Sequence, residues 1–328
     1  RELVREGWLD FNTSDITLHA GTINWTYTLG VGLMDAWRWG SHAVLVGGES
    51  NPEKWLPLIE RLKVTIFAAV PTVFRQILKY GTPESHDLQE LRHVLSAGEP
   101  LPNSVREEWA DRCKTPMYES LGMTEISTYI SNGPLVPVVP GSPGQPQIGR
   151  KVVILEPDSE STEPLPAGAI GMLAVHRSDP GLMIGYWQRP DEEKIVYRGD
   201  WFIGGDVASM DEYSNIWFNG RSDDIIKSFG FRLSPPEIES TIAKHPSVNE
   251  IAIIGLPIDT QKTIVVACVT ASTSDGLNFE ALKEFCEVNL AKYKQPHEWI
   301  EYEELPRTRN GKLQRSELVK ELIRERNF

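Results

Sequence analysis

The strongest constraint on the fold is a regular alternation of short apolar segments and helical patterns between residues 42 and 125. Strands that alternate with helices form mostly parallel sheets, because each helix returns the chain across the face of the sheet. The expected strands cover residues 42–46, 65–69, 91–96 and 117–120, and the expected helices cover residues 52–62, 72–78 and 105–109. The pattern therefore predicts an α/β fold.

The same alternation predicts where a ligand would bind. In parallel sheets, ligands lie beyond the carboxyl ends of the strands. Three loops, at residues 69–71, 96–100 and 121–125, follow expected strands. We expect all three to open into one crevice.

The rest of the chain divides into two further parts. Residues 136–222 are rich in Gly and Pro with short strands, which predicts a small β-barrel or meander. Residues 223–328 read as a compact α+β module, with a capping box at Ser234-Pro235-Pro236-Glu237 that opens a helix ending before Pro246. We expect one large domain over residues 1–222, with residues 1–135 as its α/β part, and a smaller domain over residues 223–328.

Charge and cysteine content exclude several functional classes. The chain has 33 Lys and Arg against 46 Asp and Glu, a net charge of −13, which disfavours non-specific binding of nucleic acid or an anionic membrane. The three cysteines, Cys113, Cys268 and Cys286, are too scattered for a disulfide framework or a zinc site. This fits a reducing compartment, the cytoplasm or an organelle matrix. No apolar stretch approaches the roughly 20 residues that a membrane span needs.

The C-terminal tail is basic although the protein is acidic. Residues 305–328 contain seven Lys or Arg and three Glu, and the turn dipeptide Asn310-Gly311 precedes Lys312. The ordinary interpretation is a solvated basic helix end. The alternative is a lysine on a loop tip that reaches an anionic reaction centre.

Three other residues have both an ordinary and a chemical interpretation. Arg232 lies in a polar, Gly-containing linker, where it is either a turn residue or a bidentate phosphate ligand. Asp206 ends an apolar stretch and is either a turn residue or an acceptor for ribose hydroxyls. Glu125 follows an expected strand and is either part of a strand-to-helix junction or a ligand of Mg²⁺, which prefers carboxylate oxygen.

In their order along the chain, these motifs resemble the adenylate-forming superfamily of acyl-CoA synthetases, luciferases and carrier-protein-loading adenylation domains. The segment 96–100 is similar to its adenine loop, 118–125 to its Thr-Glu motif and 201–206 to its Trp-x-x-Thr-Gly-Asp motif, with Gly204 where Thr is common. The segment 220–239 is similar to its hinge motif and 306–312 to its terminal lysine motif. The segments 131–133 and 141–144 look most like medium-chain acyl- and benzoate-CoA ligases.

The resemblance implies the fold of such a synthetase, with a mobile C-terminal domain, and roles for individual residues. The implied reaction activates a carboxylic acid as acyl-AMP with ATP and Mg²⁺ and transfers the acyl group to coenzyme A. Lys312 would bridge the carboxylate and the α-phosphate, Thr124 would donate to phosphate, and Glu125 would hold Mg²⁺. The implied nucleotide-binding residues are Gly98, Glu99, Pro100, Asp206, Arg221 and Arg232, and the implied hinge is Asp223.

The resemblance also implies a pocket for the acyl group. Its expected lining is Trp25, Tyr27, Ala69, Val70, Pro71 and Gly122. Relatives that activate acetate carry Trp at the position of Gly122, so glycine there implies room for a medium-chain or aryl acid.

One family motif has no counterpart in this sequence. A phosphate loop rich in Thr, Ser and Gly and ending in Pro-Lys is expected before the adenine loop, and nothing similar occurs between Arg1 and Ser96. We therefore expect the chain to be the C-terminal part of a longer enzyme. Two other interpretations stay open: a unit that loads a carrier protein, and a non-catalytic protein that binds AMP or an acyl-adenylate.

Overall fold

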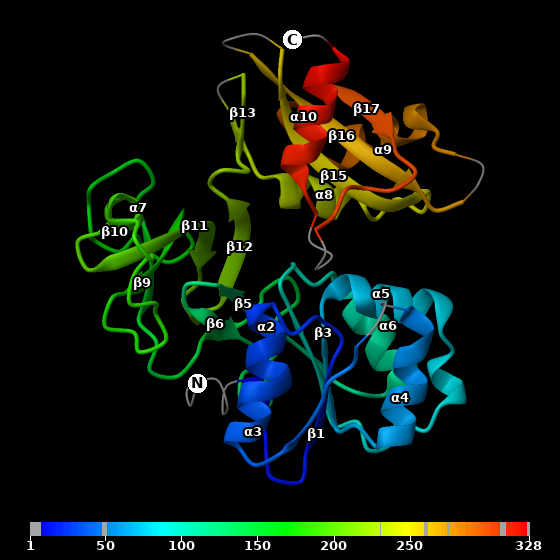
Figure 1. Cartoon of the computed structure of the whole chain (residues 1–328). Coiled ribbons are helices and arrows are strands. Elements are labelled where there is room, and N and C mark those ends of the chain that lie inside the picture. Colours follow the sequence, from blue (N-terminus) through cyan, green and yellow to red (C-terminus); the bar gives the residue numbers. More distant parts are fainter. Residues whose placement is uncertain are drawn as a thin grey trace. The chain divides into compact units, whose positions relative to one another are not determined.

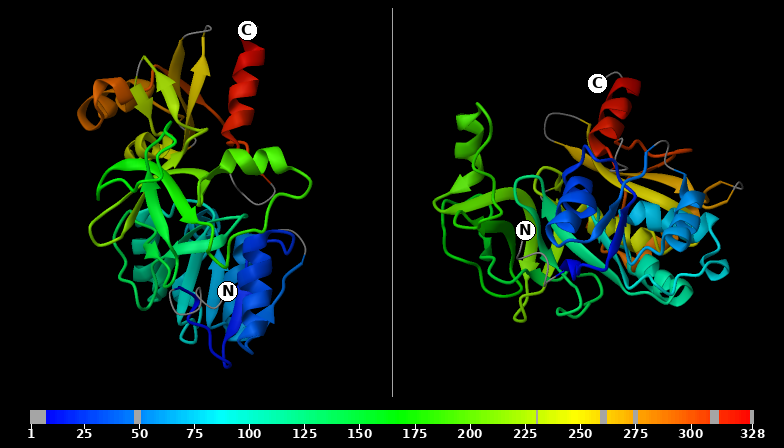
Figure 2. Two further views of the ribbon diagram at one scale, coloured as in Figure 1. Left: turned by 90° about the vertical axis from the view of Figure 1, so that its left-hand side faces the viewer. Right: turned by 60° about the horizontal axis from the view of Figure 1, so that its bottom comes forward.

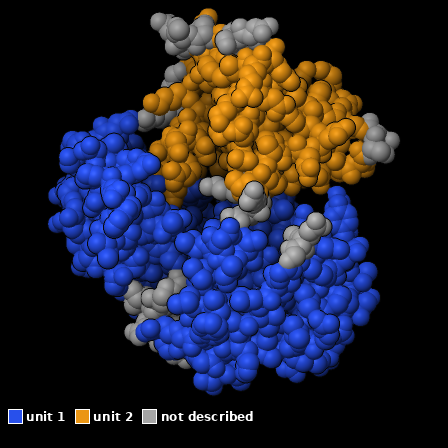
Figure 3. All heavy atoms as spheres, in the orientation of Figure 1, with its two compact units in different colours: residues 1–204, 208–218 blue, residues 205–207, 219–328 orange. Residues whose placement is uncertain are grey.

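The computed structural model divides the chain into two compact units, which Figure 3 shows in different colours. Unit 1 consists of residues 1–204 and 208–218, and unit 2 of residues 205–207 and 219–328. The structure describes residues 8–47, 51–229, 231–258, 262–273, 276–308 and 313–326. In this described part, no helix combines the length and the apolar character that crossing a bilayer requires.

Unit 1 is built around a seven-stranded sheet with the strand order β2-β1-β3-β4-β5-β6-β7 (Figure 1). Neighbouring strands from β2 to β5 run parallel, whereas β6 and β7 are each antiparallel to their predecessor. The α/β class predicted from the alternation is thereby confirmed. The strands are β1 (Ile16–His19), β2 (His42–Val44), β3 (Ile66–Ala69), β4 (His93–Ala97), β5 (Met117–Met123), β6 (Ser127–Ser131) and β7 (Gln145–Pro146).

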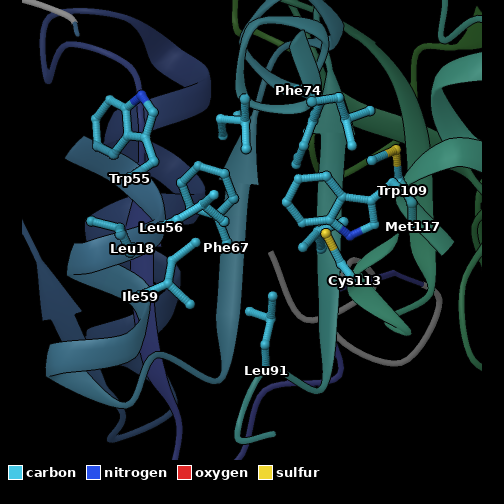
Figure 4. Close-up of a cluster of buried hydrophobic side chains, with 14 of the residues drawn as sticks. Leu18, Trp55, Leu56, Ile59, Phe67, Phe74, Leu91, Trp109, Cys113 and Met117 are labelled. Carbon is cyan, nitrogen blue, oxygen red and sulfur yellow. The ribbon is translucent and has the colours of Figure 1, made fainter. Parts of the chain in front are cut away.

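Three helices cover one face of this sheet, and their apolar side chains form the main core of unit 1 (Figure 4). Phe74 lies at its centre, with its ring edge-to-face against both Phe67 and Trp109. Asn51 opens the first of these segments because its side chain accepts a hydrogen bond from the Glu53 amide, as its N-cap position predicts. The helices are α4 (Trp55–Leu62), which follows a 3₁₀ turn at Pro52–Lys54, α5 (Pro71–Tyr80) and α6 (Asn103–Cys113).

Shorter helical segments pack on the other face of the sheet (Figure 2). These are α2 (Thr26–Leu29), a π-helical turn at Gly30–Asp35 and α3 (Ala36–Arg38). Glycine is required at position 32 of the π-helical turn, because a Cβ atom there would come within 2.7 Å of the His19 Cβ atom. A further 3₁₀ turn lies at Pro83–Ser85.

The following part of the chain forms a five-stranded sheet with the order β10-β11-β9-β8, in which β12 also pairs with β11. The short strands expected within residues 136–222 are thereby confirmed. The elements are β8 (Val152–Leu155), β9 (Ile170–His176), α7 (Pro190–Val196), β10 (Tyr197–Arg198), β11 (Trp201–Met210) and β12 (Ile216–Arg221).

Unit 2 contains a three-stranded sheet with helices packed on both faces. Residues of α8 and α9 pack on one face, and Leu318 and Leu322 of α10 pack on the other. The elements are β13 (Ile226–Ser228), β14 (Phe231–Leu233), α8 (Pro235–Ile242), β15 (Val248–Pro257), β16 (Thr263–Ala271), α9 (Phe279–Asn289), a 3₁₀ turn at Lys292–Lys294, β17 (Glu298–Glu301) and α10 (Arg315–Glu325).

The expected capping box at the start of α8 is wrong in its interactions, although the helix begins where predicted. Ser234 is the N-cap residue but makes no side-chain cap hydrogen bond. Its hydroxyl instead donates to the Asn219 carbonyl, and Glu237 pairs with Lys294. The two prolines after Ser234 lack N–H groups, so they cannot donate hydrogen bonds to its hydroxyl oxygen.

Candidate functional site

The carboxyl ends of β3, β4 and β5 lie at one edge of the sheet of unit 1. Ala69 pairs with Ser96, so β3 and β4 end within one residue of each other, whereas β5 continues from Ser120, the partner of Ala97, to Met123. The segments 69–71 and 98–100 leave the sheet directly after β3 and β4. The structure thus confirms a common edge for two of the three predicted loops, those after β3 and β4.

At this edge, the backbone of Gly98 lies close to the indole ring of Trp25. Its φ of +94° falls in the region that favours glycine, and a Cβ atom there would lie 2.9 Å from Cη2 of Trp25. The same Cβ atom would lie 3.5 Å from Cγ1 of Val70. Two expected pocket residues, Trp25 and Val70, therefore lie beside Gly98 of the expected adenine loop.

Side chains from neighbouring elements hold the adenine-loop segment in place. The Thr72 hydroxyl at the start of α5 donates to Oε2 of Glu99 over 3.0 Å. The Leu101 amide donates to Oε1 of Glu119 over 2.9 Å. Pro100, between these two anchored residues, is exposed.

Glu119 is a buried carboxyl group on β5, paired with Arg106 of α6 over 2.8 Å. Burial raises the pKa of Glu119 to about 7, although its hydrogen bonds from Leu101 and Arg106 oppose that shift. Burial likewise lowers the pKa of Arg106. The pair fixes the loop after β4 to the strand that leads to Glu125.

Thr124 and Glu125 lie in a hairpin turn between the antiparallel strands β5 and β6. The expectation that residues 121–125 form a loop is therefore only partly correct, because β5 continues through Met123. The strand-to-helix junction considered for Glu125 is wrong, since β6 follows the turn. Gly122 lies beside a register shift in this hairpin, and a Cβ atom there would come within 2.6 Å of the Ser127 carbonyl oxygen.

Glu125 is half-buried and contacts the chain between β9 and α7. The Tyr186 hydroxyl donates to Oε1 of Glu125 over 2.9 Å, and the Met183 amide donates to the Glu125 carbonyl oxygen over 2.6 Å. Burial, with a smaller effect of Glu125, raises the pKa of Tyr186 to about 12. The side-chain carboxylate thus has one oxygen already bound by a phenol.

The remaining expected pocket residues of unit 1 are mostly buried. Ala69 and Pro71 flank the end of β3, with Pro71 as the first residue of α5. Tyr27 is buried, donates its hydroxyl to the Leu95 carbonyl over 3.0 Å, and packs edge-to-face against Trp25. These contacts give Tyr27 a structural role, and its place in an acyl pocket stays a prediction.

In unit 2, three expected residues lie together. Nη1 of Arg221 lies 3.4 Å from Oδ1 of the buried Asp206, and its Nε donates to Oδ1 of Asp223 over 3.0 Å. Gly205, with φ +85°, allows this approach, because a Cβ atom there would lie 3.0 Å from Nη2 of Arg221. Asp223 itself lies in the turn after β12.

Two expected residues cannot be placed in the site. Lys312 lies outside the described residues. Arg232 pairs through its backbone with Lys227 in the β13–β14 hairpin. Their roles stay predictions.

Sequence reasoning missed Glu119, Tyr186 and His19. His19 ends β1, is buried, and packs edge-to-face on Tyr27 with ring centroids 4.4 Å apart; burial lowers its pKa to about 3. A charged or titratable residue inside an apolar strand pattern was the available signal for Glu119 and His19. Nothing local marks Tyr186, because its partner is 61 positions away in the sequence.

The donor set fits a magnesium ion that is shared with a phosphate-bearing substrate. Mg²⁺ is commonly held by one or two carboxylates together with substrate phosphates. The described residues contain no group of three or more His, Cys, Asp or Glu that could bind a metal by themselves. A single half-buried carboxylate at the edge of the sheet, Glu125, is compatible with that mode of binding.

Two family models match the chain. The AMP-binding enzyme model covers residues 2–187, and the AMP-binding enzyme C-terminal domain model covers residues 237–312. The first match spans more than half of the chain.

Individual relatives agree with these models. The chain is 35% identical over 317 residues to an acetyl-coenzyme A synthetase of Bacillus subtilis, covering 94% of this chain and 54% of that protein. It is 33% identical over 325 residues to the uncharacterized acyl-CoA ligase YtcI of the same organism, covering 95% of this chain and 59% of the relative.

A solved structure resembles the whole chain. The anthranilate CoA ligase AuaEII, crystallised with anthranoyl-AMP, superimposes with a TM-score of 0.90 at 30% identity, covering 100% of this chain and 63% of that one. The chain thus spans little more than half the length of the curated relatives described above. Together, the order of the strands, the shared edge and these matches establish that the chain belongs to the AMP-binding enzyme family.

Proposed function

We propose that the protein containing this chain is an ATP-dependent acyl-CoA synthetase, an acid–thiol ligase that forms AMP. The observation that carries the proposal is the shared sheet edge, where the Gly98–Pro100 segment and the Thr124–Glu125 turn follow adjacent parallel strands. Relatives and structural neighbours include an acetyl-CoA synthetase and an anthranilate CoA ligase.

The reaction has two halves. In the first, the substrate carboxylate attacks the α-phosphorus of ATP, and the bond to pyrophosphate breaks, giving acyl-AMP. In the second, the thiolate of coenzyme A attacks the acyl carbon, and AMP leaves. Both halves depend on orientation and on neutralising crowded oxyanions more than on covalent help from the protein.

The residues of unit 1 are suited to binding the nucleotide and the acid. Gly98 and Pro100 would flank the adenine, and Glu99 would orient the loop through its bond to Thr72. Thr124 is exposed in the turn, where its hydroxyl would donate to phosphate. A magnesium ion bound at Glu125 would neutralise charge on the phosphate oxygens.

The resemblance assigns further roles to residues of unit 2. Asp206, with Arg221 beside it, would accept hydrogen bonds from the ribose hydroxyls, and Arg232 would bind phosphate. Lys312 would stabilise the negative charge that gathers between the carboxylate and the α-phosphate. A rotation about Asp223 would withdraw Lys312 so that the thiol can enter, because hinges are a few junction residues that absorb the backbone change.

For the acid, we propose a medium-chain or aryl carboxylate. Trp25 and Val70 lie against Gly98, so an acyl group next to them would be close to the adenylate. The resemblance places Gly122 in the lining of the acyl pocket, where glycine would leave room for a larger acid. If acetate were preferred over hexanoate and benzoate, this pocket assignment would be wrong.

The central experiment measures ATP–pyrophosphate exchange and thioester formation by the complete protein with acetate, hexanoate and benzoate. We expect Lys312→Ala to slow exchange by roughly 10²–10³-fold, as removal of one group that stabilises developing charge does. Lys320→Ala is the matched control, because Lys320 belongs to the same basic tail but pairs with Glu317 on α10. Undiminished exchange in Lys312→Ala would refute the role of Lys312. AMP binding without exchange would indicate a non-catalytic protein.

A further inference from the structure

The turn that carries Glu125 is attached to a distant segment of unit 1, residues 179–186. Two hydrogen bonds join this segment to Glu125, one from the Tyr186 hydroxyl to the carboxylate and one from the Met183 amide to the carbonyl. The carbonyl bond fixes the backbone of the turn, and the phenol fixes the direction of the side chain. Such paired contacts restrict both the position and the rotamer of the carboxylate.

A buried ion pair anchors the other end of the same segment. Nη1 of Arg150 lies 2.5 Å from Oδ1 of Asp179, and the two side chains are only 2% and 0% exposed. Arg150 also donates through Nη2 to the Thr128 carbonyl on β6 over 3.1 Å. Arg150 therefore links the segment to the strand that follows the Glu125 turn.

Local backbone geometry is adapted to this anchor. The Gly181 amide donates to Oδ1 of Asp179 over 2.8 Å. A Cβ atom at residue 181 would lie 2.5 Å from Nη1 of Arg150, so a side chain there would push the guanidinium away. The segment is thus held at Asp179 and Gly181, and again at Met183 and Tyr186.

From this geometry we propose that Tyr186 is a positioning residue, which orients the Glu125 carboxylate for the metal ion that accompanies ATP. The inference rests on the proposed function, because it takes Glu125 as the metal ligand. The phenol binds one oxygen of Glu125, and the second oxygen would be the one that holds the metal ion. Partners of ligating carboxylates commonly contribute about 10–100-fold to metal affinity, because they fix the ligand before the metal arrives.

The test compares metal-bound with metal-free nucleotide on the complete protein. Tyr186→Phe removes one oxygen atom and keeps the ring, so the packing of the segment is preserved. We expect the dissociation constant of Mn²⁺·ATP, measured by water proton relaxation enhancement, to rise about tenfold. Binding of ATP in excess EDTA, measured by calorimetry, is expected to change by less than about twofold, because the phenol acts through its hydrogen bond to the metal-ligating carboxylate.

Two further variants make the outcome decisive. Tyr213→Phe, at an exposed tyrosine of unit 1, is expected to leave both affinities unchanged. Glu125→Gln is expected to weaken Mn²⁺·ATP binding at least as much as Tyr186→Phe. If Glu125→Gln weakens it and Tyr186→Phe does not, or if Tyr186→Phe weakens metal-bound and metal-free ATP equally, the positioning role is refuted. If Glu125→Gln has no effect, the assignment of Glu125 as metal ligand in the proposed function fails first.

Discussion

Each unit contains a glutamate that accepts hydrogen bonds from an arginine and a backbone amide: Glu119 of unit 1 is buried, and the side chain of Glu239 of unit 2 is 15% exposed. In unit 1, Glu119 accepts hydrogen bonds from the Leu101 amide and from Arg106. In unit 2, Glu239 of α8 accepts hydrogen bonds from the Ile253 amide on β15 and from Arg315 at the start of α10. Burial raises the pKa of both carboxyl groups, and the arginines oppose that rise.

The difference lies in what each glutamate anchors. Glu119 fixes a loop that follows β4 and belongs to the candidate site. Glu239 joins a helix to its own sheet, while the expected site residues of unit 2 rely on the half-exposed pairs of Arg221 with Asp206 and Asp223. Asp206 is buried, but Arg221 is partly exposed and Asp223 mostly so, and water competes well for the exposed pair of Arg221 with Asp223, which contributes little to rigidity. The candidate-site loop of unit 1 is therefore held rigidly, whereas Arg221 and Asp223 of unit 2 are held by a contact that rearranges easily.

The largest expected effect comes from removing either arginine. Arg106→Met and Arg315→Met each leave a largely buried carboxyl group without its charged partner, which costs about 3–5 kcal/mol of unfolding free energy. Hydrogen exchange should show lost protection around residues 98–101 for Arg106→Met, and in α8 and α10 for Arg315→Met. Arg189→Met, in an exposed pair with Glu192, should cost less than about 1 kcal/mol. Loss of protection spread equally over both units would contradict the comparison.

A second prediction tests how tightly the unit 1 loop is packed. Gly98→Ala combines an unfavourable positive φ with a contact to Trp25, and we expect it to cost about 2–3 kcal/mol. Gly168→Ala is the matched control, because its φ of +82° is similar but a Cβ atom there meets nothing within 4 Å. It should cost only about 1 kcal/mol of backbone strain. If urea denaturation showed the same loss of unfolding free energy in both variants, the contact with Trp25 would contribute nothing to the cost.

The pH dependence of stability gives a third prediction. The pKa of Glu119 is about 7 in the folded chain and 4.5 in its ordinary state, so the folded state binds more protons between these values. The unfolding free energy of the protein therefore falls by roughly 1–3 kcal/mol as the pH rises from about 4.5 to 7. Glu119→Gln should remove this dependence of the unfolding free energy on pH. Any destabilisation caused by the amide itself is the same at every pH. Parallel stability–pH curves for the two proteins would refute the buried titration.

The smallest effect on stability is expected at Asp223. Its side chain is 68% exposed and pairs with Arg221, so Asp223→Ala should change the unfolding free energy by less than about 1 kcal/mol. If Asp223 is the hinge, the same variant should alter the rate of thioester formation and leave ATP–pyrophosphate exchange nearly unchanged. Single-turnover assays of the two half-reactions separate these effects. A large loss of stability would show that Asp223 makes a rigid contact, and it would contradict the difference drawn between the two units.

Much of unit 1 could be predicted from the sequence because its signals are local. The apolar periodicity between residues 42 and 125 indicated strands, helices and their parallel order, and the structure confirms the common edge of the loops at residues 69–71 and 98–100. The helix after Asn51 followed from its N-cap and proline, which act within one turn. Element bounds shifted by a few residues, since strand ends depend on their neighbours.

Other features depend on which segments meet in space. The hairpin after Met123 forms because β6 pairs antiparallel to β5. The Ser234 hydroxyl makes no capping hydrogen bond to α8, because it donates to the Asn219 carbonyl. The fold class, the alternating strands and helices between residues 42 and 125 and the edge after β3 and β4 thus follow from the amino-acid sequence alone, because periodicity and turn residues act over a few positions. Only the tertiary structure decided that Tyr186 meets Glu125 and that Arg106 meets Glu119, because those contacts join residues that no local pattern relates.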